Sequence, residues 1–191
     1  MRNKKIRGLA VFLLMIFLAV GCTKKEEQSK NETTEPKPSI ENKNLSEETN
    51  LFWNDEEDFS VKIPKRFVFQ DKETVEDGTS GMVYRFSTED GETLEISDLL
   101  FPDEEVNEAL LEEEMKQSEE LEIIRVDNME VDEGQFYGLL VEDKASGNFM
   151  FYHRIKRDDR IISFLQIKPE AFSEEDEIEN KTLLRSIRYS Y

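Results

Sequence analysis

Apolar and polar residues alternate along much of the chain after position 50, and this pattern predicts a series of β-strands. Residues 59–63 place apolar side chains at every second position, as in a half-buried strand. Residues 82–86 and 93–97 read as two more strands. The sequence Glu89-Asp90-Gly91 lies between them, and Asp-Gly is a strong hairpin signal. We therefore expect an antiparallel hairpin in this part of the chain.

Four further strands are predicted one after another in the second half of the chain. They span residues 123–131, 135–142, 148–156 and 160–168. Glycine, serine and aspartate residues lie between them, as in tight turns. This spacing predicts an antiparallel meander. Segments 137–141 and 149–152 are apolar on both faces, so we expect both sides of this sheet to be covered.

Two helices are predicted around this meander. Residues 103–115 open with acidic side chains, which the positive end of the helix dipole favours, and continue as an apolar stripe with acids elsewhere. The second helix begins after Ser173, the predicted N-cap, with Asp176 in the capping-box position. The side chains predicted to pack this last helix on the sheet are Ile178, Leu183, Leu184 and Ile187.

This order of elements occurs together with two short motifs. The first strand reads Phe59-x-x-x-Ile63-Pro64, and the last helix closes on Leu183-Leu184-Arg185-Ser186-Ile187-Arg188-Tyr189. With these features, residues 51–191 resemble the PsbP/Mog/DcrB-like superfamily. The resemblance implies an α+β fold, an α/β/α sandwich in which helices flank an antiparallel β-sheet. Members of this superfamily have unrelated functions, so the resemblance implies no activity.

The N-terminus has the pattern of an export signal. Four basic residues occur within the first seven positions, and residues 8–21 are uncharged and largely apolar. This matches a secretory signal peptide. A stable transmembrane helix needs about 20 apolar residues, so the run is short for a permanent span.

The chain's single cysteine, Cys22, directly follows this apolar run. The segment Leu18-Ala19-Val20-Gly21-Cys22 resembles a bacterial lipobox. The resemblance implies cleavage between Gly21 and Cys22 and a diacylglyceryl group on the Cys22 sulfur, which would fix the protein to the outer face of the cell membrane through the lipid bilayer. Two alternatives remain, an ordinary signal peptide with a chance cysteine and an uncleaved signal anchor.

These observations divide the chain into three parts. Residues 1–21 are the predicted lipoprotein signal peptide, 22–50 a flexible acidic and polar tether, and 51–191 a single globular α+β domain. The tether contains too few apolar side chains to offset the entropy of ordering it, and as a flexible coil it spans on the order of 30 Å. Trp53, the single tryptophan, lies at the start of the domain. It either fixes the tether to the domain or forms part of a contact surface.

Charge limits the possible partners. Removal of the predicted signal peptide takes away four basic residues and no acidic one, which changes the formal net charge from −19 to −23. Such a surface repels nucleic acid and attracts a partner with a basic face.

The sequence contains few residues that could support catalysis or metal binding. His153, the only histidine, shares a predicted strand face with apolar residues and is interpreted as structural. With Cys22 acylated no thiol remains, which excludes disulfides, thiolate metal sites and cysteine nucleophiles. With one histidine and no recognisable motif for a nucleophile, we expect no catalytic residue, no metal site and no cofactor. Residues 71–78 have their acids in the wrong register for a calcium-binding EF-hand loop. Loose divalent-cation binding to the acidic helix stays open.

The preferred hypothesis is a non-enzymatic binding or assembly module. It would be lipid-anchored on the extracytoplasmic side and would hold a protein partner in the cell envelope. A small-ligand-binding or divalent-cation-binding lipoprotein is the alternative. A hydrolase with an unrecognised site containing His153 is the third possibility.

Overall fold

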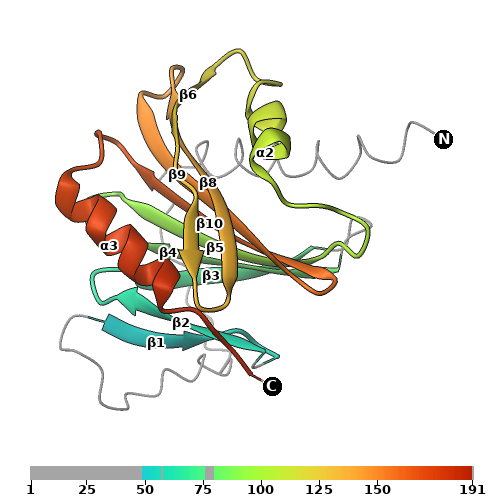
Figure 1. Ribbon diagram of the computed structural model, residues 1–191. Helices are drawn as coiled ribbons and strands as arrows, with labels where there is room; N and C mark the ends of the chain where they lie inside the picture. The colour runs from blue at the N-terminus through green and yellow to red at the C-terminus, as the bar shows by residue number, and fades with distance from the viewer. Residues whose placement is uncertain (1–48, 57, 76–79, 191) are drawn as a thin grey trace. The chain divides into compact units, whose positions relative to one another are not determined.

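The computed structural model describes residues 49–56, 58–75 and 80–190, which form eleven strands and two helices (Figure 1). The strands are β1 (Thr49–Trp53), β2 (Phe59–Pro64), β3 (Val68–Val75), β4 (Gly81–Ser87), β5 (Thr93–Leu100), β6 (Leu121–Val126), β7 (Met129–Val131), β8 (Gly134–Asp143), β9 (Asn148–Arg157), β10 (Arg160–Lys168) and β11 (Arg188–Tyr189). The helices are α2 (Glu108–Met115) and α3 (Glu174–Arg185). Predicted signal residues Gly21 and Cys22 lie outside the described residues.

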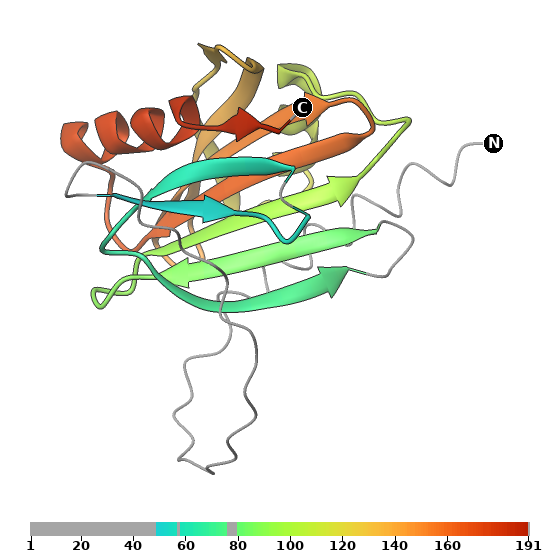
Figure 2. The same ribbon diagram turned by 90° about the horizontal axis from the view of Figure 1, so that it is seen from below.

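The strands form two antiparallel sheets. The larger sheet has the order β3-β4-β5-β10-β9-β8-β6, and β7 pairs with β8 next to β6. The predicted meander is therefore confirmed, although the strand predicted at 123–131 is divided into β6 and β7. A smaller sheet has the order β1-β2-β11. Figure 2 shows β1 and β2 crossing in front of the large sheet, with α3 beside them.

The expected α/β/α sandwich is wrong. The described residues are mostly strand, with two helices, and the second layer over the large sheet is shared between α3 and the three-stranded sheet. On the other face, α2 is only eight residues long and contacts β6 and β8. The prediction failed because β1 and β11 are short, and because β11 pairs with β2 from the far end of the chain, so local alternation did not reveal a second sheet.

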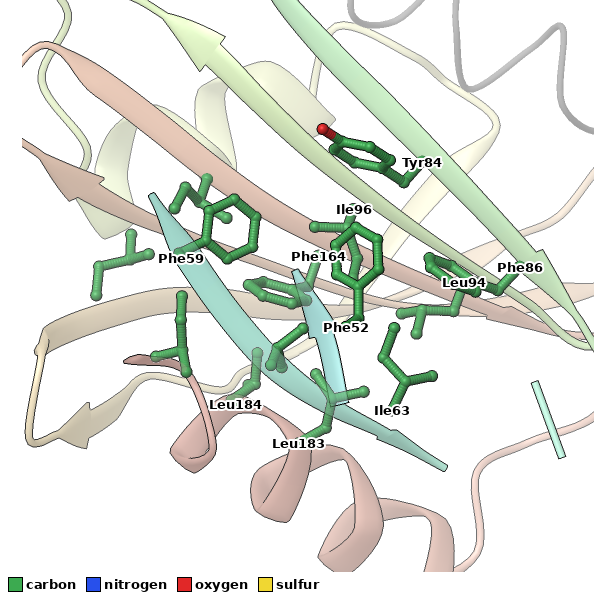
Figure 3. Close-up of a cluster of buried hydrophobic side chains, with 14 of the residues drawn as sticks. Phe52, Phe59, Ile63, Tyr84, Phe86, Leu94, Ile96, Phe164, Leu183 and Leu184 are labelled. Carbon is green, nitrogen blue, oxygen red and sulfur yellow. The ribbon is translucent and has the colours of Figure 1, made fainter. Parts of the chain in front are cut away.

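The main core lies between the large sheet and this second layer (Figure 3). Phe52 of β1 packs edge-on against Tyr84 and Phe86 of β4, with ring centroids 5.0 and 5.4 Å apart. Leu183 and Leu184 of α3 enter the same cluster. Burying one such side chain stabilises the folded state by roughly 1.5–3 kcal/mol. Because the cluster contains many such side chains from both layers, it is the main link between them.

The two helices begin at side chains that cap them. The Asn107 side chain accepts a hydrogen bond from the Leu110 backbone N–H, so α2 begins after Asn107 and not at the acidic residues before it. The predicted capping box of α3 is confirmed, because Ser173 and Asp176 bind each other's backbone N–H. The prediction that Ile178 packs on the sheet is wrong, since it is 60% exposed.

Candidate functional site

A pocket with a volume of about 280 Å³ lies where the β9–β10 turn meets the smaller sheet. Its walls come from four separate stretches of the chain. They are residues 157–160 and Ile162, Asp98 of β5, Asp58 and Phe59 at the start of β2, and Tyr189 and Ser190 at the end of β11. The volume fits a small molecule or one large side chain, below the usual range for drug-sized ligands.

Strand pairing brings these stretches together. Arg157 and Arg160 pair across a two-residue turn in which Asp158 has a φ of 52°, a left-handed conformation that aspartate tolerates better than most residues. Tyr189 pairs with Phe59, and the Ser190 backbone N–H donates to the Asp58 carbonyl at 2.8 Å. Tyr189 and Ser190 therefore close one side of the pocket.

Arg160 is fully engaged with carboxylates. Its Nε and one terminal nitrogen donate to Asp98 at 2.7 and 2.8 Å, and its other terminal nitrogen donates to Glu56 at 2.9 Å. Asp98 is 1% exposed and also accepts from the Asn54 amide at 3.1 Å. Burial lowers the pKa of Arg160, but these acidic partners outweigh it and the pKa is raised overall. The positive charge of Arg160 is thus neutralised within the wall.

Arg157 stacks on the aromatic side of the pocket. Its guanidinium carbon lies 5.1 Å from the centroid of the Tyr189 ring, and its Nε lies 3.8 Å from a carboxylate oxygen of Asp158. The Tyr189 hydroxyl is buried and has no hydrogen-bond partner among the described residues. Burial raises the pKa of Tyr189, so this hydroxyl stays neutral.

Two acidic side chains at the pocket form no ion pair with any residue that the structure describes. Asp58 and Asp159 are both exposed, and within the described part of the chain their carboxylates accept no hydrogen bond and form no ion pair. The charge of Asp58 helps to raise the pKa of Arg160, although the two side chains are not within ion-pair distance. The residues that line the pocket include four aspartates and two arginines. The pocket therefore has an excess of negative charge beside apolar and aromatic walls.

Trp53 does not line this pocket. It lies in β1 opposite Ser60 and is half-buried, whereas its neighbour Phe52 points into the core. Its predicted role, as a link to the tether or as a contact residue, stays a prediction.

His153 lies in the interior, away from the pocket. It is fully buried, and its Nε2 lies 3.1 Å from the backbone oxygen and from Oδ2 of Asp127. Burial raises the pKa of the Asp127 carboxyl, but the hydrogen bond with His153 and the charges of Lys181 and Arg125 outweigh it and lower the pKa overall. This arrangement ties β9 to the segment between β6 and β7, which agrees with the structural interpretation of His153.

Two glutamates of the acidic helix α2 form ion pairs with basic side chains. Glu114 of α2 is buried and accepts a hydrogen bond from Arg154 at 2.8 Å, while Glu112 pairs with Lys116 on the surface. Among the described residues, no three histidine, cysteine, aspartate or glutamate side chains are grouped so that they could hold a metal ion. The 71–78 segment considered for calcium lies partly outside those residues.

No helix in the described ranges is long and apolar enough to cross a membrane.

Sequence reasoning missed the pocket residues. Asp58, Arg160 and Tyr189 are far apart along the chain and form no motif. The one local signal is Asp158-Asp159, the aspartates between the strands predicted at 148–156 and 160–168, and this pair predicts a turn but not a site.

Comparison with known proteins supports the fold. No protein-family model matches the chain, and no curated protein sequence matches it. The chain is similar to the solution structure of cyanobacterial PsbP (CyanoP) from Synechocystis sp. PCC 6803, with a TM-score of 0.59 and 13% identity; the match covers 80% of this chain and 98% of that chain. The protein therefore has a PsbP-like fold, as the sequence resemblance implied. At this identity the likeness says nothing about function.

Proposed function

We propose that this protein is a lipid-anchored, extracytoplasmic binding module that holds a protein partner with a basic face in the cell envelope. In this proposal it catalyses no reaction. The observation that carries the binding role is the pocket beside the β9–β10 turn, where Asp58 and Asp159 are exposed and form no ion pair among the described residues. Charge complementarity of this kind increases the rate of association and selects the partner.

The anchor is supported by the position of Cys22 directly after the apolar N-terminal run. Two acyl chains hold a protein stably on a bilayer, whereas one chain binds only marginally. We expect the wild-type protein in the membrane fraction and a Cys22→Ala variant outside it. Mass spectrometry of the mature N-terminus should find the acyl mass on Cys22. A Cys22→Ala variant that is processed normally and stays with membranes contradicts the anchor.

The partner is best sought in intact cells. Chemical crosslinking followed by mass spectrometry should recover an envelope protein that carries a basic surface, and recovery should fall as the salt concentration rises, because salt screens exposed charges. Failure to recover any envelope protein contradicts the binding role.

The size of the pocket favours a second candidate function, the binding of a small cationic molecule. A volume of about 280 Å³ holds such a molecule without a protein partner. A thermal-shift screen separates the two functions, because a ligand that binds the folded state raises the melting temperature in the absence of any other protein.

A further inference from the structure

We propose that the pocket beside the β9–β10 turn binds one alkylammonium or guanidinium group carried on an apolar stem, such as the side chain of a lysine or arginine. This inference deepens the proposed function and rests on it for the source of the group. The same chemistry also occurs in free alkylamines and alkylguanidines, so the experiment must separate the two sources.

The charges around the pocket select a cation. Arg160 donates from three nitrogens to Asp98 and Glu56, so it offers little to an incoming anion. Asp58 and Asp159 are exposed and form no ion pair within the described residues. A carboxylate accepts a charge-assisted hydrogen bond from an ammonium or guanidinium group, and such bonds are about twice as strong as neutral ones.

The walls select a group with an apolar stem. Phe59 and Ile162 border the pocket but are almost fully buried, so the apolar surface open to a ligand comes mainly from the half-buried ring of Tyr189. Lysine and arginine side chains bury their methylene stems along apolar surface while the charged head stays near water. The position of the Arg157 guanidinium, 5.1 Å from the centroid of the Tyr189 ring, shows that this ring accepts a cation on one face.

The binding test uses the full chain in detergent micelles and three probes. Two probes are n-butylguanidinium and a blocked Gly-Gly-Arg-Gly-Gly peptide, and the third is methylguanidinium, which has the charge without the stem. Binding is followed by NMR through the backbone amides of Phe59 and Tyr189. We expect saturable shifts with the first two probes and clearly weaker binding of the third.

Matched variants test the role of the acids. The double variant Asp58→Asn/Asp159→Asn should bind n-butylguanidinium about tenfold more weakly, as expected when charge-assisted hydrogen bonds are lost. The control is Glu119→Gln/Glu120→Gln, which makes the same change in net charge at two other acids without ion pairs in the described chain. The control should bind like the wild type. Thermal unfolding should be nearly unchanged in both, because the four side chains are exposed and form no ion pair within the described residues.

The outcomes separate the inference from the proposed function. The inference is overturned if the probes cause no saturable shift at the pocket, or if both double variants weaken binding equally. If an envelope partner is still crosslinked to Asp58→Asn/Asp159→Asn at the wild-type level, partner binding holds but does not use this pocket. If the probes bind and no partner is recovered from cells, the cation site holds and the partner-binding function fails.

Discussion

Arg160 of β10 reaches diagonally to the adjacent strand β5 and donates two hydrogen bonds to the carboxylate of Asp98, at 2.7 and 2.8 Å. In the register of the sheet, Asp98 is opposite Ile162, two residues further along β10. Asp98 is 1% exposed. Its charge is therefore stabilised inside the protein mainly by this guanidinium.

Replacing Arg160 by methionine should destabilise the protein by roughly 3 kcal/mol, because a buried carboxylate loses its partner. The measurement is urea unfolding at neutral pH. Lys144→Met is the control, since Lys144 pairs with Glu122 where both side chains are more than half exposed, and such pairs contribute about 0–1 kcal/mol. Equal losses in the two variants would show that Asp98 gains no special stability from Arg160.

Gly138 leaves room for the ring of His153. A methyl group at Gly138 would overlap this ring and would lie 2.8 Å from the backbone oxygen of Asp127. Gly138→Ala should therefore cost about 1–3 kcal/mol through overpacking. Thermal or urea unfolding measures this loss.

A double-mutant cycle tests the cause. In a His153→Ala background the ring is gone, so adding Gly138→Ala should cost less than it does in the wild type. The same cost in both backgrounds would mean that the backbone oxygen of Asp127, and not His153, limits the space.

The elements that could be predicted from the sequence are those whose signals are local. Strand β10 was predicted with its observed bounds, because its apolar run is bounded by the Asp158-Asp159 turn. The capping box of α3 was recognised because Ser173 and Asp176 are three residues apart and contact each other directly. In both cases the residues that define the element lie within one short window of the chain.

The elements that were missed depend on distant contacts. Strand β11 has only two residues and exists because Arg188 and Tyr189 pair with Ser60 and Phe59, far away in the sequence. The acids at 103–105 favour the first turn of a helix, but the segment is a loop. Lys156 holds its backbone by donating to the carbonyl oxygens of Pro102, at 3.3 Å, and Glu104. Periodicity and propensity carry no information about such pairings. The pocket could not be predicted for the same reason.

Phe52 and Trp53 are neighbours in β1 with different environments. Phe52 is 5% exposed and packs against Phe59, Tyr84 and Phe86, whereas Trp53 is half-buried. Phe52→Ala should cost about 3–5 kcal/mol, and Trp53→Ala about 1 kcal/mol. Chemical denaturation followed by circular dichroism measures both losses, and a larger loss for Trp53→Ala would contradict the core described here.

The fluorescence of Trp53 is a separate test of its link to the tether, since strongly red-shifted, quenchable emission argues against that link.

The stability of the protein in acid should depend on Asp176. Burial raises the pKa of this carboxyl, but hydrogen bonds from Lys168 and Ser173 outweigh it, so the pKa in the folded state lies below the ordinary value of 3.8. A carboxyl with a lowered pKa stabilises the folded state at pH values above its pKa in the unfolded chain. This contribution is lost as the pH falls from near 3.8 through the pKa in the folded state.

Asp176→Asn should therefore be less stable than the wild type at pH 7, and the difference should shrink as the pH falls below 4. Urea unfolding at pH 7, 4 and 3 measures the difference, with Glu175→Gln as the control, because Glu175 lies in the same helical turn and is exposed. A difference that stays constant from pH 7 to pH 3 would show that the Asp176 charge does not stabilise the helix.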